Sequence, residues 1–143
     1  MTTHAARGDR YLLDANMLAG VLLGRKGAVA LADPWITNQE AATSIIVYGE
    51  VVEYAMGFAD YTRRLAHLQA LLHDISAYPV TYAIMERYAA LRRAMRPSGL
   101  IGDVDTLIAA TAIEHGLTLV TTDNHFKRVP GLLHRVLPLR VIK

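Results

Sequence analysis

The sequence contains no cysteine, and this excludes disulfides, thiolate zinc sites and cysteine nucleophiles. It also lacks any uninterrupted apolar run of the roughly 20 residues that a membrane-spanning helix needs. Residues 1–10 are polar and contain no apolar segment typical of a secretion signal. We therefore predict a soluble, cytoplasmic protein.

A strong charge of one sign is absent as well. The net charge is only +2, which does not by itself indicate a nucleic-acid partner. Apolar residues make up 52% of the chain and charged residues 20%, a balance that excludes a wholly disordered protein. The length of 143 residues suits one domain. We predict a flexible N-terminal tail over residues 1–9 and a single domain over residues 10–143.

Short apolar runs alternate with longer segments of helical periodicity along the chain. The apolar runs predict strands over residues 11–13, 43–46, 77–80, 117–120 and 137–142. The periodic segments predict helices over residues 16–23, 28–32, 47–56, 61–75, 81–96 and 103–115. Pro138 places the last strand at an edge of the sheet. Strands that alternate with helices indicate an α/β fold with a mostly parallel sheet.

Four acidic residues fall near predicted strand ends or helix starts. Asp14 and Asp123 follow strands, Glu50 lies at the start of a helix after a strand, and Asp105 lies in the first turn of a helix. Ligands of parallel α/β sheets bind outside the carboxyl ends of the strands. We therefore expect these four carboxylates to lie at one edge of the sheet.

The chemistry of such a cluster indicates a divalent cation. Each acid taken alone is compatible with a surface or turn residue, since acids are favourable in the first turn of a helix. Crowded carboxylates, however, repel one another, and hard oxygen ligands select Mg²⁺ or Mn²⁺. Because such an ion activates water and neutralises charge on a phosphodiester, metal-dependent phosphodiester hydrolysis is the leading hypothesis.

Four sequence blocks around these acids resemble those of PIN domains. The blocks are Leu-Leu-Asp-Ala-Asn at 12–16, the segment 44–50, Asp-Thr-Leu-Ile-Ala-Ala at 105–110, and Leu-Val-Thr-Thr-Asp-Asn-His-Phe at 119–126. The chain is most similar to VapC-type toxins of VapBC toxin–antitoxin modules. The order and spacing of the four blocks fit the pattern of these toxins from about residue 10 to the end of the chain.

The resemblance implies a PIN-like three-layer α/β/α fold with a central, mostly parallel sheet. It further implies an endoribonuclease toxin that depends on Mg²⁺ or Mn²⁺, inhibits translation, forms a homodimer and is silenced by a VapB-type antitoxin. Which RNA it cleaves is not specified. The resemblance assigns the metal and catalytic roles to Asp14, Glu50, Asp105 and Asp123, with Asn16 and Thr121 as polar support.

Each of three further residues near these acids is compatible with two roles. Asp103 is either the N-terminal cap of its helix or an additional support of the metal site, because it and Asp105 point in different directions. Glu53 is either exposed or an auxiliary ligand. His125 suits a structural role beside Phe126 better than a role as general base.

Aromatic residues and methionine gather in residues 48–61, where they form either core packing or a groove for a helix of another chain. Two further functions remain open from the sequence. One is a non-catalytic PIN-like module that binds RNA or a protein partner. The other is phosphoryl transfer to Asp14, which lies at the end of the first strand; the absence of a second acid at Asn16 disfavours it.

Overall fold

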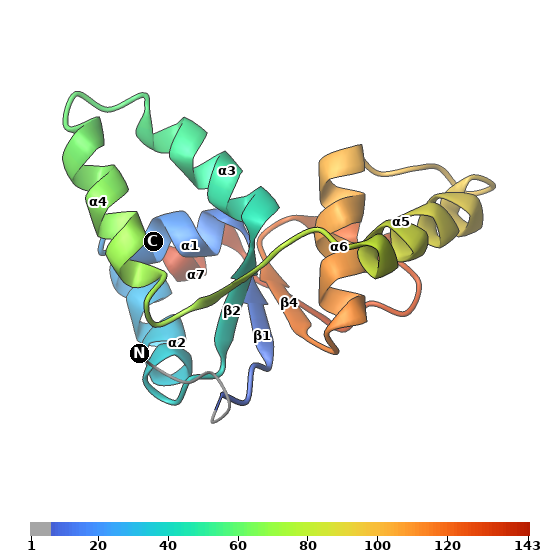
Figure 1. Ribbon diagram of the computed structural model, residues 1–143, viewed down its shortest axis with the longest axis horizontal. Helices are drawn as coiled ribbons and strands as arrows, with labels where there is room; N and C mark the ends of the chain where they lie inside the picture. Colours follow the sequence, from blue (N-terminus) through green and yellow to red (C-terminus); the bar gives the residue numbers. More distant parts are fainter. Residues whose placement is uncertain (1–6) are drawn as a thin grey trace.

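The computed structural model describes residues 7–143, which contain a single five-stranded sheet (Figure 1). All four strand pairings are parallel and the strand order is β3-β2-β1-β4-β5. The strands are β1 (Tyr11–Leu13), β2 (Ala41–Ser44), β3 (Ser76–Tyr78), β4 (Thr118–Thr121) and β5 (His134–Val136). The predicted α/β class with a parallel sheet is confirmed.

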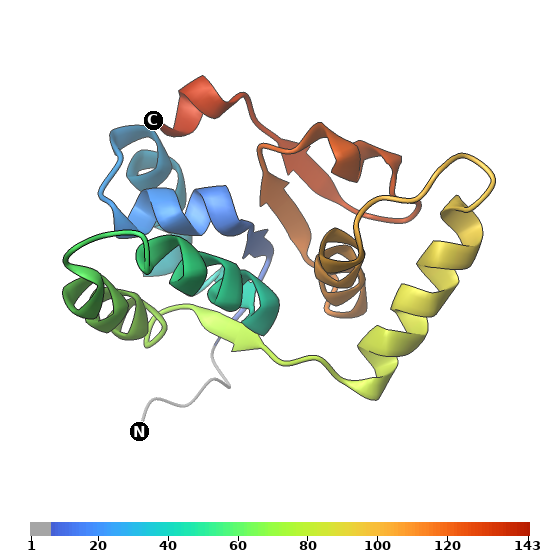
Figure 2. The same ribbon diagram turned by 90° about the horizontal axis from the view of Figure 1, so that it is seen from above.

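Helices cover both sides of this sheet, which completes the predicted three-layer α/β/α fold. The α-helices are α1 (Ala15–Leu22), α2 (Lys26–Thr37), α3 (Ile45–Ala55), α4 (Tyr61–Leu71), α5 (Tyr82–Met95), α6 (Asp103–Glu114) and α7 (Leu139–Ile142), and a 3₁₀ helix η2 spans Asn124–Arg128. Helices α1 to α4 and α7 lie on one side, and α5 and α6 on the other (Figures 1 and 2).

The central strands are apolar on both faces, as expected for a sheet covered on both sides. Leu12 of β1 pairs with Ala42 of β2 on one side and with Leu119 of β4 on the other, and all three are fully buried. Helices on either side remove this apolar surface from water, which is the main favourable contribution to folding.

Strand β2 passes directly into α3, without an intervening loop. Ser44, the last residue of β2, is also the N-cap of α3, and its hydroxyl oxygen accepts a hydrogen bond from the Val47 backbone N–H at 3.0 Å. The cap satisfies one of the unpaired N–H groups at the start of the helix. It therefore fixes the start of α3 at the carboxyl edge of the sheet.

The predicted strand over residues 137–142 is wrong. The fifth strand is His134–Val136, and Leu139–Ile142 form α7 instead. Helix α7 packs against α2 at Gly27, where a Cβ atom would lie only 1.9 Å from the Val141 carbonyl oxygen. The Gly27 N–H donates to the Lys143 carbonyl at 3.1 Å. This docking, which is not local in sequence, determines the structure of the segment.

Residues 7–9, predicted as part of a tail, pack against the start of the sheet. The buried Arg7 guanidinium forms an ion pair with Asp9 at 3.0 Å and donates to the carbonyl oxygens of Ala41 and Asp74. The Tyr78 hydroxyl donates to the other oxygen of Asp9 at 2.6 Å. The tail prediction is therefore wrong for residues 7–9, whereas residues 1–6 lie outside the described part of the chain.

Among residues 7–143, no helix combines the length and the apolar character needed to cross a membrane.

Candidate metal centre at the carboxyl edge of the sheet

Four acidic side chains come from four different elements at the carboxyl edge of the sheet. Asp14 is the N-cap of α1 directly after β1, and Asp123 is the N-cap of η2 shortly after β4. Glu50 lies in the second turn of α3, and Asp105 in the first turn of α6. Helix α6 contacts α3, and its N-terminus lies at this edge because its C-terminus leads into β4.

Asp14 is held at the junction of the two central strands. Its backbone N–H donates to the Val120 carbonyl of β4 at 3.0 Å, and its Oδ2 accepts from the Thr121 hydroxyl at 2.6 Å. The Thr121 oxygen in turn accepts from the Asp123 N–H at 3.1 Å. Burial raises the pKa of Asp14, the hydrogen bond from Thr121 lowers it, and the charge of Asp123 raises it. Thr121 thereby orients Asp14 and favours its ionised form.

The Glu50 carboxylate has a raised pKa and one oxygen without a hydrogen-bond donor within residues 7–143. Its pKa is raised to about 7, chiefly by burial and then by the charges of Asp14, Asp105 and Glu53. Its Oε1 atom is buried and has no hydrogen-bond partner among the described residues. A buried carboxylate oxygen without a donor is costly, so this position suits either a proton or a cation.

Asp105 and Asp123 share a neighbour in His125. Burial raises the pKa of Asp105, the charges of Asp14 and Asp123 raise it, and His125 lowers it. The Asp123 Oδ1 accepts from the His125 backbone N–H at 2.8 Å and lies 2.9 Å from the His125 Nδ1. Phe126 is buried, but the His125 side chain is 69% exposed and contacts Asp123.

The residues at this edge fit a hard divalent cation. The donors are carboxylate oxygens, the ligands that Mg²⁺ and Mn²⁺ prefer. Three of the four carboxylates have pKa values raised partly by the charge of another member of the set, and a cation would relieve that repulsion. In the present side-chain arrangement no three acidic or histidine groups of residues 7–143 converge within ligand distance. Glu50 Oε1 is the buried side-chain atom that lacks a hydrogen-bond partner among residues 7–143.

Asp103 is directed toward α5. Gly102, not Asp103, occupies the N-cap of α6 and Asp103 is the first helical residue, so the predicted capping role is wrong. The Asp103 carboxylate instead pairs with the Arg92 guanidinium and accepts from the Tyr88 hydroxyl at 3.1 Å. Both partners belong to α5, and the role of Asp103 as an additional support of the metal site stays a prediction.

The remaining predicted residues flank the four acids. The Asn16 amide donates to the Thr122 hydroxyl oxygen at 2.7 Å, which ties α1 to the segment after β4. Glu53 is exposed, yet its charge contributes to the raised pKa of Glu50, one turn earlier on α3. Tyr54 and Met56 are 44% and 60% exposed, so this part of the aromatic segment is surface, not core.

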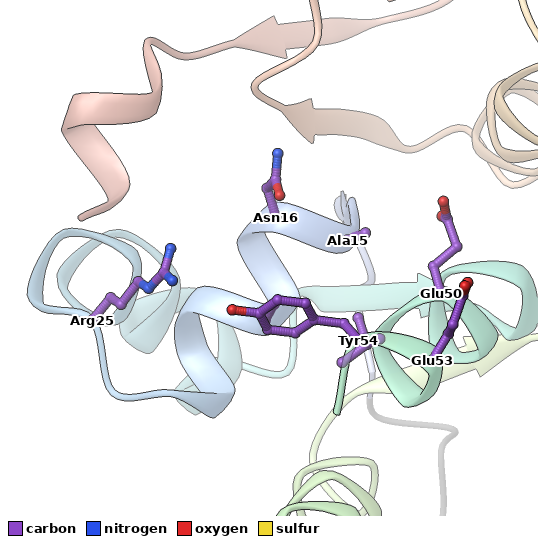
Figure 3. Close-up of a pocket in the computed structure, with 8 residues that line it drawn as sticks. Ala15, Asn16, Arg25, Glu50, Glu53 and Tyr54 are labelled. Atoms are coloured by element: carbon purple, nitrogen blue, oxygen red, sulfur yellow. The ribbon is translucent and has the colours of Figure 1, made fainter. Parts of the chain in front are cut away.

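The structure also places near the site a residue that the sequence did not single out. Arg25, the N-cap of α2, lines a pocket of about 420 Å³ together with Glu50 (Figure 3). Its only signal in the sequence is a basic pair between two glycines, Gly24 and Gly27. Such a pair is ordinary in a surface turn, and only the folding of the α1–α2 connection toward α3 brings Arg25 into the same pocket as Glu50.

Comparison with known families identifies the class of the protein. The PIN domain model matches residues 11–132, and the chain belongs to the PIN domain family. Comparison with curated proteins gives no match.

Solved structures extend this comparison to toxin–antitoxin complexes. DNA-bound VapBC from Salmonella typhimurium is similar with a TM-score of 0.80 at 19% identity, over 90% of this chain and 98% of that chain. VapBC2 from Rickettsia felis, bound to a promoter DNA fragment, is similar with a TM-score of 0.78 at 24% identity, over 89% and 98%. A toxin–antitoxin complex from Klebsiella pneumoniae has a TM-score of 0.68 at 26% identity, over 85% and 94%.

Proposed function

We propose that this chain is a VapC-type toxin, an endoribonuclease that hydrolyses RNA phosphodiesters with a bound Mg²⁺ or Mn²⁺ and thereby inhibits translation. The observation that carries the proposal is the buried Glu50 Oε1, which has no hydrogen-bond partner among the described residues and belongs to a set in which the pKa values of Asp14, Glu50 and Asp105 are raised. The PIN family membership and the similarity to VapBC structures support the choice of nuclease chemistry.

The proposed role of each residue follows from its contacts. Asp14, Glu50, Asp105 and Asp123 would hold the cation. When bound, the cation would lower the pKa of an attacking water and neutralise charge that develops on the phosphodiester. Thr121 keeps one oxygen of Asp14 oriented and Asn16 fixes α1 against the loop after β4.

Asp105→Asn tests this proposal, and Asp103→Asn is its matched control, because both change one acid to its amide in the first turn of α6. We expect wild-type protein to cleave a mixed pool of cellular RNA with Mn²⁺ or Mg²⁺ and not with EDTA. Asp105→Asn should lose at least 100-fold in rate, and Asp103→Asn should keep most of it. Cleavage in EDTA, or equal rates for Asp105→Asn and wild type, would contradict the proposal.

The proposed partners are a VapB-type antitoxin and a second copy of the chain. The similar solved structures include VapBC complexes, which supports an antitoxin partner. The exposed Tyr54 and Met56 offer an apolar contact for its helix. Expression of the wild-type chain alone should reduce labelled methionine incorporation, and co-expression of the antitoxin should restore it. Sedimentation analysis of the purified chain measures the proposed homodimer, which a monomer at all concentrations would contradict.

A further inference from the structure

A pocket of about 420 Å³ includes Glu50, one of the four acids, and lies between α1, α3 and the start of α2 (Figure 3). Its lining residues are Ala15, Asn16, Ala19, Arg25, Glu50, Val51, Glu53 and Tyr54. Glu50 belongs both to the pocket and to the acidic set, so a molecule that reaches the acids can continue into the pocket. Its size falls within the range of small-ligand sites, roughly 300–1,000 Å³.

Arg25 supplies the positive charge of this pocket. It is partly buried, and among residues 7–143 its guanidinium makes no ion pair and no hydrogen bond. The position is defined by the backbone, because the Arg25 N–H donates to the Gly20 carbonyl at 2.9 Å. A free guanidinium in a pocket is suited to a phosphate, whose oxygens it binds in pairs.

Tyr54 supplies a flat apolar surface in the same pocket. In Figure 3 its ring extends from α3, with Arg25 on one side and the two glutamates on the other. The ring is held edge-on by Phe58, with centroids 5.2 Å apart, and Arg64 lies over the Phe58 ring at 4.2 Å. Because 44% of Tyr54 is exposed despite these contacts, a base can stack on it.

We propose that this pocket binds one nucleotide of the RNA strand adjacent to the cleaved phosphodiester, with its base on Tyr54 and a phosphate on Arg25. The proposal rests on the proposed function, since RNA held at the acids must continue on either side of the cleaved bond. An unpaired arginine beside an exposed aromatic ring matches the alternating phosphates and bases of a single strand. Stacking on a tyrosine accepts every base, so the pocket contributes affinity with little sequence preference.

Binding of a fluorescein-labelled, random-sequence RNA of twelve nucleotides tests the pocket, measured by anisotropy with Mg²⁺. All proteins carry Asp105→Asn so that the probe stays intact. We expect Tyr54→Ala to weaken binding about tenfold or more, and Tyr54→Phe to bind within twofold of the parent because the ring is kept. Arg25→Gln should weaken binding and reduce the salt dependence by about one phosphate contact.

Arg93→Gln is the matched control for charge, because Arg93 is an exposed arginine of α5 on the other side of the sheet. It should weaken binding less than Arg25→Gln. Equal losses for the two arginine variants, or no loss for Tyr54→Ala in a protein that circular dichroism shows to be folded, would overturn the proposal. Equal losses for Tyr54→Phe and Tyr54→Ala would overturn the stacking role.

Two further outcomes separate this pocket from its alternatives. Loss of antitoxin co-purification in the Tyr54 and Arg25 variants with unchanged RNA binding would make the pocket a protein-docking site and overturn the proposal. RNA cleavage is measured in a separate assay with the protein that retains Asp105. If it cleaves no RNA but the binding differences hold, the proposed function fails and the nucleotide pocket stands.

Discussion

Replacement of Glu50 by glutamine should change how the stability of the metal-free protein depends on pH. The pKa of Glu50 is raised from 4.5 to about 7, chiefly by burial and then by the charges of Asp14 and Asp105. The folded state therefore binds more protons than the unfolded state between these two values. The free energy of unfolding falls as pH rises through this window, because a proton that favours the folded form is lost.

The magnitude follows from the size of the shift. Each pKa unit corresponds to about 1.4 kcal/mol, so the full loss would be about 3 kcal/mol. Glu50 is only partly buried, and solvent screening reduces the expected loss to about 1–2 kcal/mol. Glutamine has a similar shape and does not titrate. Relative to wild type, Glu50→Gln should therefore be more stable at pH 8 than at pH 5 by about 1–2 kcal/mol.

Urea unfolding with EDTA at pH 5 and pH 8 measures this change for wild type and Glu50→Gln. The comparison between the two proteins cancels the titration of groups that they share. Glu86→Gln, at an exposed position of α5, is the control and should show no pH-dependent difference from wild type. With Mn²⁺ at a hundredfold excess over its Kd, wild type should gain about 2.7 kcal/mol and Glu50→Gln less. The reasoning is refuted if the stability difference between Glu50→Gln and wild type is the same at both pH values.

Two other substitutions test the support of the site and the docking of the C-terminal helix. Thr121→Val removes the hydroxyl that donates to Asp14, so it should raise the pKa of Asp14 and weaken Mn²⁺ binding about tenfold, as measured by calorimetry. Thr121→Ser keeps a hydroxyl and should bind Mn²⁺ like wild type. Equal affinity of all three proteins would contradict the proposed support of Asp14 by Thr121. Gly27→Ala should destabilise the fold by about 2–3 kcal/mol in thermal unfolding, because the added Cβ would collide with the Val141 carbonyl. At Gly49 an added Cβ meets nothing within 4 Å, so Gly49→Ala should stabilise α3 by about 0.5–1 kcal/mol. Unchanged stability of Gly27→Ala would contradict the close approach of α7 to α2.

The sequence predicts well those parts of the fold in which a local run of apolar residues indicates a buried strand. The run Leu12–Leu13 before Asp14 and the run Leu119–Val120 before Thr121 are fully buried in the central strands, and their apolar residues mark where the strands end. The positions of Asp14 and Asp123 at the carboxyl edge follow from these strand ends. A parallel sheet covered on both faces leaves little ambiguity in such runs.

The parts that the sequence does not predict depend on contacts between distant segments. Strand β5 begins with exposed, polar His134 and Arg135 at the edge of the sheet, so its composition does not distinguish it from a loop. The partner of Asp103 is Arg92, and this pair depends on how α5 packs against α6. Arg25 lies at the pocket only because α2 starts where α1 and α3 meet.

The strand order has a consequence for the time at which a nascent chain can acquire its acidic edge. Asp14 is fixed by Thr121, 107 residues later in the chain, and β1 completes its pairing only when β4 is available. Ribosome-bound chains that end before residue 118 therefore carry Asp14, Glu50 and Asp105 without the strand that brings them together. Contacts of such long sequence separation form late. Premature termination within this span therefore yields fragments that lack the assembled acidic edge.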